Sequence, residues 1–201
     1  MITSITKEEI SLLETEEFPG RVIVVESESE ADQAVSYLSG FGVLGFDTET
    51  RPAFKKGVVN EVSLIQLSTI DTCYLFRLNL FGFPPSLVKL LSSPELTKVG
   101  LSLRDDFTAM NRRMVLKPQG FEDLQSLAPK YGIEDMSLQK VYALLFNKKI
   151  SKSQRLSNWD APQLSESQKK YAALDAWACL KIYECLLSKS QIPSGATKNI
   201  K

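Results

Sequence analysis

The sequence predicts one α/β domain in which a central mixed β-sheet is flanked by helices. Strand-like segments gather in the first half of the chain, and helical segments follow with one strand interposed. The 201 residues suffice for one well-packed core and are short for two. No internal repeat and no long linker divides the chain. This order of elements fits several α/β folds, so motifs must narrow the choice.

Two residue patterns predict the individual elements. Runs of β-branched and apolar residues predict strands at 21–25, 43–47, 62–69, 73–78 and 96–100. Apolar positions at helical spacing, bounded by turn residues, predict helices at 28–38, 84–91, 104–114, 123–130, 137–146 and 166–187.

The chain is expected to have three parts. Residues 1–20 form a lead segment, expected to be a short acidic helix that ends at Pro19-Gly20. Residues 21–187 form the domain proper. Residues 188–201 are small and polar and are expected to form a flexible tail.

The charge balance and the absence of histidine restrict the chemistry. The 24 Lys and Arg residues equal the 24 Asp and Glu residues, so an anionic partner would need a local cluster of positive charge. The chain has no histidine. That excludes Ser-His-Asp and Cys-His catalysis, histidine-ligated zinc and a histidine general base. Carboxylates, tyrosine, lysine, serine or a hard metal ion must carry any reaction.

The cysteines and the N-terminus indicate a reducing, cytoplasmic location. Cys73, Cys179 and Cys185 form no CxxC pair, so neither a disulfide framework nor a zinc site is expected. Residues 1–17 are acidic and lack the basic-then-apolar order of a signal peptide. No apolar run approaches the ~20 residues that a membrane-spanning helix requires.

A pair of carboxylates ends the strand at 43–47. Asp47 and Glu49 are two residues apart, and side chains alternate along a strand, so both project to the same face. Two like charges this close are costly unless they protonate or a cation lies between them. Hard oxygen ligands suit Mg²⁺ or Mn²⁺. A solvated acidic turn explains the pair equally well when it is considered alone.

A tyrosine and an aspartate share one face of the last helix. Ser165 and Gln168 form a capping box that predicts where this helix begins. Tyr171 and Asp175 are four residues apart, and apolar neighbours surround Asp175, where a charge needs a partner. A core helix with a hydrogen-bonded Tyr–Asp pair is the structural alternative.

Together, these segments resemble the DEDD superfamily of 3′→5′ exonucleases, in its tyrosine-bearing branch with RNase D and the Werner-syndrome exonuclease domain. Phe46-Asp-Thr-Glu-Thr50 resembles the first motif of the family. Tyr171-Ala-Ala-Leu-Asp175, after Trp159, Leu164 and Gln168, is similar to the third, and the strand Val62-Ser-Leu-Ile-Gln-Leu-Ser68 also matches. The resemblance covers about residues 21–187 and implies an RNase H-like fold. A sister branch has histidine in place of this tyrosine, and this chain has none.

Two adjacent aspartates compete for the second motif. In the Werner-like members the aspartate lies six residues after a glycine, which here is Gly100 and indicates Asp106. Helical phase agrees, because Asp106 flanks the apolar face that contains Phe107 and Met110, whereas Asp105 lies nearly opposite.

The resemblance implies a metal-dependent hydrolysis of phosphodiesters. Asp47, Glu49, Asp106 and Asp175 would bind two divalent cations, Mg²⁺ or Mn²⁺, which can stabilise the attacking and leaving oxygens. Tyr171 would orient the attacking water, since an unperturbed pKa of about 10 makes it a poor base. The substrate would be a single-stranded or 3′-ended nucleic acid, DNA or RNA, and the product a nucleoside 5′-monophosphate.

A basic stretch precedes the last helix and is a candidate nucleic-acid contact. Residues 136–159 contain no acidic residue but several cations, and those singled out for phosphate binding are Lys148, Lys149, Lys152 and Arg155. A solvated helix and loop is the alternative. Two other functions also stay open: a nucleic-acid-binding module of the same fold without turnover, and an adaptor whose acidic residues are surface charge.

Overall fold

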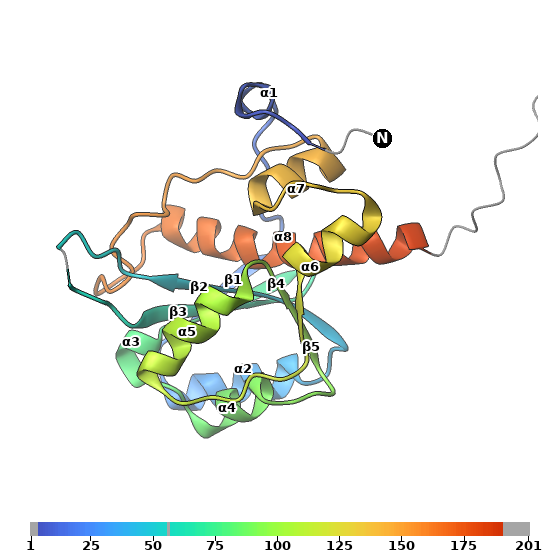
Figure 1. The fold of residues 1–201 in the computed structure, drawn as a ribbon. Helices are drawn as coiled ribbons and strands as arrows, with labels where there is room; N and C mark the ends of the chain where they lie inside the picture. Colours follow the sequence, from blue (N-terminus) through green and yellow to red (C-terminus); the bar gives the residue numbers. More distant parts are fainter. Residues whose placement is uncertain (1–3, 56, 191–201) are drawn as a thin grey trace, which may run out of the picture.

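A six-stranded mixed sheet forms the centre of the computed structural model, which describes residues 4–55 and 57–190 but not the side chains of 189 and 190 (Figure 1). The strands lie in the order β1-β4-β3-β2-β5-β6. The pairs β2–β3 and β3–β4 are antiparallel, and the pairs β1–β4, β2–β5 and β5–β6 are parallel. The strands are β1 (Arg21–Val25), β2 (Val43–Thr50), β3 (Val62–Ser68), β4 (Thr72–Phe76), β5 (Thr97–Gly100) and β6 (Phe121–Asp123).

Helices cover both faces of this sheet. Helices α7 and α8 lie on one face, and α2, α4 and α5 lie on the other (Figure 1). The helices are α1 (Lys7–Ser11), α2 (Glu28–Leu38), α3 (Leu78–Phe81), α4 (Pro85–Leu91), α5 (Leu103–Arg113), α6 (Leu124–Leu127), the 3₁₀ helix η1 (Ala128–Tyr131), α7 (Leu138–Phe146) and α8 (Glu166–Ser190). The predicted α/β class with a mixed sheet is therefore confirmed.

Helix α8 lies unusually close to strand β2, and small residues make this possible. A Cβ atom on Gly45 would lie 1.9 Å from the carbonyl oxygen of Ala176. Ala172, Ala173 and Ala176 on the facing side of α8 are fully buried. Since Asp47 follows Gly45 on the same face of β2, the close approach brings α8 against the acidic end of that strand.

Three predicted elements differ from the structure. The expected helix at 123–130 is strand β6, helix α6 and the 3₁₀ helix η1, which contains Pro129. The strand expected at 73–78 ends at Phe76, because Arg77 turns out of the sheet and buries its guanidinium against the carbonyl oxygens of Ala161 and Pro162.

The lead segment is the third difference. Its helix ends at Ser11, not at Pro19-Gly20, and the chain then runs extended. Thr15 forms a β-bridge with Lys149, in which the Glu16 amide donates to the Lys149 carbonyl at 2.8 Å. Backbone hydrogen bonds to residue 149 therefore take the place of the helical hydrogen bonds that were predicted for this part of the lead segment.

At the C-terminus, α8 continues through Ser190, beyond the boundary predicted at 187. The remainder of the predicted tail, 191–201, lies outside the described residues. Among the helices described, none has the length and apolar character needed to cross a membrane.

Candidate active site

Three carboxylates from two elements converge between β2 and α8. Asp47 and Glu49 project from the same face of β2, and Asp175 meets them from α8. One oxygen of each lies within 4.8 Å of the others. Asp175 is buried, and its Oδ1 atom has no hydrogen-bond partner among the described residues. The structure brings together these three of the residues that the sequence singled out.

Burial and mutual repulsion perturb these carboxyl groups strongly. Burial raises the pKa of Asp47 well above its ordinary range, and the charges of Asp106, Asp175 and Glu49 raise it further. Burial raises the pKa of Glu49 to about 9, with Asp175 and Asp106 adding to the effect. Burial raises the pKa of Asp175 to about 7, although a hydrogen bond from Tyr171 and the charge of Lys152 oppose the shift. So many buried carboxylates need a cation to be ionised together.

The fourth carboxylate, Asp106, lies beside this group but has a different partner. It projects from the first turn of α5 and accepts a hydrogen bond from the Thr48 hydroxyl. Burial raises its pKa to about 7, against the lowering effect of that bond. Asp105 is exposed, in agreement with the predicted helical phase. Asp106 does not belong to the three-carboxylate group.

Helix α5 is itself fixed by a residue that the sequence analysis did not identify. The Asp123 carboxylate, at the end of β6, accepts hydrogen bonds from the backbone amides of Ser102 and Leu103, both at 3.0 Å. An anion at a helix N-terminus is favourable. The sequence predicts no strand at β6, and Asp123 is expected to begin a helix, so no local pattern indicates this contact.

Tyr171 lies one helical turn before Asp175. The predicted capping box is present, since Gln168 Oε1 accepts from the Ser165 amide at 3.0 Å and Ser165 Oγ accepts from the Gln168 amide at 3.2 Å. The Tyr171 ring is buried and lies 6.1 Å from that of Trp159. Burial raises the pKa of Tyr171, as do the charges of Asp175 and Glu49, so the phenol stays protonated at neutral pH.

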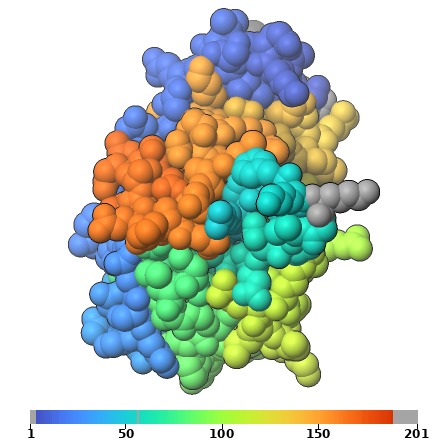
Figure 2. All heavy atoms as spheres, turned by 90° about the vertical axis from the view of Figure 1, so that its left-hand side faces the viewer, coloured from blue at the N-terminus to red at the C-terminus, as the bar shows by residue number. Residues whose placement is uncertain are grey.

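A cavity of about 290 Å³ opens over the carboxylates, and two of the four predicted basic residues line it. We call it the carboxylate cavity; Asp47, Tyr171 and Asp175 line it together with Lys152 and Arg155. The other pair contacts the lead segment, because Lys148 forms an ion pair with Glu16 at 2.9 Å and the Lys149 ammonium donates to the Ser11 carbonyl. Figure 2 shows the segment before α8 (orange) beside the loop after β2 (cyan), with the lead segment (dark blue) above.

Comparison with known proteins assigns the family. The 3′-5′ exonuclease domain family matches residues 22–191, which include β2–β6, all of β1 except its first residue, and Asp47, Glu49, Asp106 and Asp175. The chain belongs to the 3′-5′ exonuclease family. The bifunctional 3′-5′ exonuclease/ATP-dependent helicase WRN of Mus musculus is 33% identical over 85% of this chain. A 3′-5′ exonuclease of Arabidopsis thaliana is 30% identical over 89% of it. The chain spans 13% of the mouse protein and 68% of the plant protein.

Solved structures agree with the RNase H-like fold of this nuclease family. The Nibbler EXO domain of Aedes aegypti superposes with a TM-score of 0.74 at 28% identity, over 85% of this chain and 90% of that domain. Escherichia coli RNase D superposes with a TM-score of 0.73 at 21% identity, over 86% of this chain and 47% of that protein, which supports the fold alone.

The acidic site fits a divalent cation. Three carboxylate oxygens within reach of one another, and a buried Asp175 oxygen without a partner, are what a hard cation requires. The family uses divalent metals, and the three carboxylates of this cluster could hold such an ion. One further polar group lies beside it: Gln66 is directly opposite Asp47 in the β2–β3 ladder, and both its side-chain amide atoms are buried without a hydrogen-bond partner among the described residues. No local pattern in the sequence predicts a role for Gln66.

Proposed function

We propose that this chain removes nucleotides from the 3′ end of a nucleic acid by metal-dependent phosphodiester hydrolysis and releases nucleoside 5′-monophosphates. The observation that carries the proposal is the convergence of Asp47, Glu49 and Asp175 within 4.8 Å, inside a chain of the 3′-5′ exonuclease family. The catalytic domain would comprise residues 21–187, and the preceding lead segment would support it.

Asp47, Glu49 and Asp175 would hold one Mg²⁺ or Mn²⁺ ion, and Asp106 would contribute to a second beside Asp47. Two such cations stabilise the charge that develops on the attacking and leaving oxygens of a phosphoryl transfer. Within the protein, the Thr48 hydroxyl donates a hydrogen bond to one oxygen of Asp106.

Tyr171 would orient the attacking water. Its raised pKa keeps the hydroxyl protonated, so the residue can donate and accept hydrogen bonds but cannot act as a general base near neutral pH. The contact with Trp159 and the capping box at Ser165 hold the helix turn that carries it. This role corresponds to the tyrosine-bearing branch of the superfamily.

Lys152 and Arg155 would bind the phosphates of the strand. Both side chains line the carboxylate cavity and are exposed, and their charges lower the pKa of Asp175 and Glu49 respectively. Lysine and arginine at such a position bind phosphate without reading base identity, so affinity for the strand should fall steeply with salt.

The test uses a 5′-labelled single strand, as DNA and as RNA, with Mg²⁺ or Mn²⁺. We expect a ladder that shortens from the 3′ end and is lost in EDTA. Asp47→Ala should slow the reaction by at least ~10²-fold, the scale for losing positioned charge stabilisation. Binding of the strand without shortening under either cation would identify a nucleic-acid-binding module instead, and near-normal turnover of Asp47→Ala would overturn the metal assignment.

A further inference from the structure

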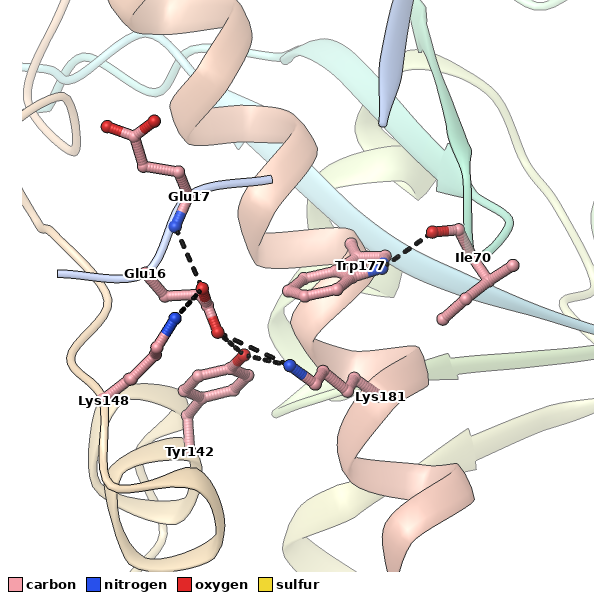
Figure 3. Close-up of polar contacts among 7 residues, drawn as sticks. All are labelled: Glu16, Glu17, Ile70, Tyr142, Lys148, Trp177 and Lys181. Carbon is pink, nitrogen blue, oxygen red and sulfur yellow. Dashed lines mark hydrogen bonds and ion pairs between the residues drawn. The ribbon is translucent and has the colours of Figure 1, made fainter. Parts of the chain in front are cut away.

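A buried carboxylate, that of Glu16, anchors the lead segment to the domain in addition to the bridge between Thr15 and Lys149. Glu16 is 8% exposed and accepts hydrogen bonds from the Tyr142 hydroxyl at 2.6 Å and from the Lys148 ammonium at 2.9 Å. The Lys181 ammonium lies 3.4 Å away. Figure 3 shows these donors reaching Glu16 from α7, from the loop after α7 and from α8. A single residue thus ties the lead segment to three parts of the domain.

The cations around Glu16 balance its negative charge, so this carboxylate should repel an anionic ligand only weakly. Burial alone would raise its pKa, but the hydrogen bonds from Tyr142 and Lys148 and the charge of Lys181 outweigh burial and lower it to about 2. Its negative charge is therefore matched by two ammonium groups. In Figure 3 the Glu17 carboxylate points away from this cluster.

The anchored segment forms the wall of a second cavity. This cavity, which we call the N-terminal cavity, has a volume of about 220 Å³ and lies between residues 15–18 and the first turns of α8. Ser151 and Tyr171 line both it and the carboxylate cavity, so the two are neighbours across these side chains. Residues 15–18 precede the part of the chain that the family match covers, residues 22–191.

The lining of the N-terminal cavity combines two kinds of surface. Phe18, Leu174 and the ring of Tyr171 provide apolar and aromatic surface. The Ser151 hydroxyl donates to the Ser153 hydroxyl at 3.1 Å, so the Ser153 hydroxyl and the Lys170 ammonium are the donors suited to a phosphate or a sugar, and the exposed Glu17 also lines the cavity. Aromatic surface next to hydrogen-bond donors and a cation is how proteins bind single-stranded nucleic acid without reading its sequence.

We propose that the N-terminal cavity is a second nucleotide subsite, which binds a nucleotide of the substrate strand next to the one held at the carboxylates. The base lies against Phe18 and Leu174, and the backbone phosphate lies on the side of Ser153 and Lys170. The inference rests on the proposed function, because its ligand belongs to the same strand.

The test measures binding of a fluorescently labelled single strand to the full chain in EDTA, where the strand is not hydrolysed. Lys170→Glu and Lys169→Glu make the same change of charge at neighbouring positions of α8, of which Lys170 is exposed and Lys169 half-buried. Lys170 lines the cavity, whereas Lys169 pairs with Glu166. We expect Lys170→Glu to weaken binding by about 10-fold and to reduce the salt slope by about 0.7, the value for one single-strand phosphate contact. Lys169→Glu should change neither by a comparable amount.

A cavity-filling variant tests the location independently. Ser167 is exposed and lines the N-terminal cavity, so Ser167→Trp should occupy it without disturbing the core. Binding should weaken, and Lys170→Glu should have little further effect in that background, because residues that serve one ligand are not additive. Equal effects of the two lysine variants, additive effects of Ser167→Trp and Lys170→Glu, or no binding by the unaltered chain would overturn the subsite.

Hydrolysis assayed separately distinguishes this proposal from the proposed function. Shortening of the strand with unchanged binding by Lys170→Glu would overturn only the subsite. Binding that depends on Lys170 without shortening would overturn only the exonuclease activity.

Discussion

Asp106 is held differently from the other carboxylates of the site. Asp47, Glu49 and Asp175 approach one another, whereas Asp106 is oriented by the Thr48 hydroxyl, which projects from the opposite face of β2. Residues 47, 48 and 49 therefore organise the site from both sides of one strand. An exposed neighbour of the same chemistry, Asp105, provides a matched control on the same helix.

We predict that Asp106→Ala slows nucleotide release by at least ~10²-fold, because it removes a charge positioned at the reacting phosphate. Asp105→Ala, which removes an exposed charge, should stay within about twofold. Single-turnover rates on a labelled 3′ end measure both variants. Comparable losses in the two variants would show that the total negative charge of α5, and not the position of Asp106, determines the rate.

The packing of the Tyr171 ring and the chemical role of its hydroxyl can be tested separately. Tyr171→Phe keeps the ring beside Trp159 and removes only the hydroxyl. We expect kcat to fall by about 10²-fold, at the low end for loss of a group that positions a proton or water, with KM nearly unchanged. Tyr183→Phe, on the same helix and half-buried, is the control. A selective increase in KM for Tyr171→Phe would assign the hydroxyl to strand binding instead.

At the residue scale, the sequence identified the carboxylates because each follows a strong local pattern. Asp47 and Glu49 end an apolar strand, Asp175 follows a capping box, and helical phase separates Asp106 from Asp105. The partners of Lys148 and Lys149 could not be predicted, because they lie more than a hundred positions away in the sequence, in the lead segment. The position of Gln66 beside the site could not be predicted either, because it depends on the pairing of Gln66 with Asp47 between β3 and β2.

At the scale of elements, the contact between β2 and α8 sets the distance between the two halves of the acidic site. Gly45→Ala would place a methyl group 1.9 Å from the Ala176 carbonyl, so α8 must move. We expect this variant to lose about 1–3 kcal/mol of unfolding free energy, the usual cost of overpacking, and most of its activity.

Gly42→Ala is the matched control, because nothing lies within 4 Å of an added Cβ there. Urea denaturation and the strand-shortening assay measure both. If Gly45→Ala were as stable and active as Gly42→Ala, the close approach of α8 would not govern the site.

The lead segment should confer an acid-sensitive part of the stability. The pKa of Glu16 is about 2 in the folded protein, against an ordinary 4.5. A carboxyl whose folded pKa is lowered contributes stability that is present above pH 4.5 and is lost as the pH falls toward 2. Glu16→Gln should therefore cost about 2 kcal/mol near pH 7, the scale of hydrogen bonds to a charged group, and clearly less near pH 3.

Denaturation at the two pH values measures this difference. Glu17→Gln, which changes an exposed neighbour, should show no such dependence. An equal cost of Glu16→Gln at both pH values would mean that shape, and not charge, anchors the lead segment.

Elements were predictable where they carry a long periodic pattern and were missed where tertiary contacts override it. Helix α2 and strand β1 match the predicted bounds, because apolar spacing and caps define them locally. Strand β6 is only three residues long and exists through its pairing with β5. The lead segment is extended because Thr15 pairs with Lys149, a partner that no local pattern reveals.

At the scale of the whole molecule, the acidic site couples stability to cation binding. Buried like charges destabilise the metal-free protein, and a cation that binds only the folded state stabilises it by mass action. At about 100 times Kd this amounts to ~2.7 kcal/mol, or a rise in Tm of about 5–10 °C for a chain of this size. Mg²⁺ or Mn²⁺ should produce this rise, and EDTA should reverse it.

Asp47→Asn tests this expectation, because the substitution should raise the Tm in EDTA but reduce the rise in Tm that Mn²⁺ causes. Asparagine cannot ionise, so the substitution removes the free energy spent on keeping the Asp47 carboxyl protonated or buried as an anion and should raise Tm in EDTA, because burial and three neighbouring carboxylates oppose ionisation of Asp47. The same substitution should shrink the rise caused by Mn²⁺, because a ligand is lost. Asp105→Asn, at an exposed position, should change neither. A lower Tm in EDTA together with a full response to Mn²⁺ would mean that Asp47 stabilises the fold and does not bind the cation.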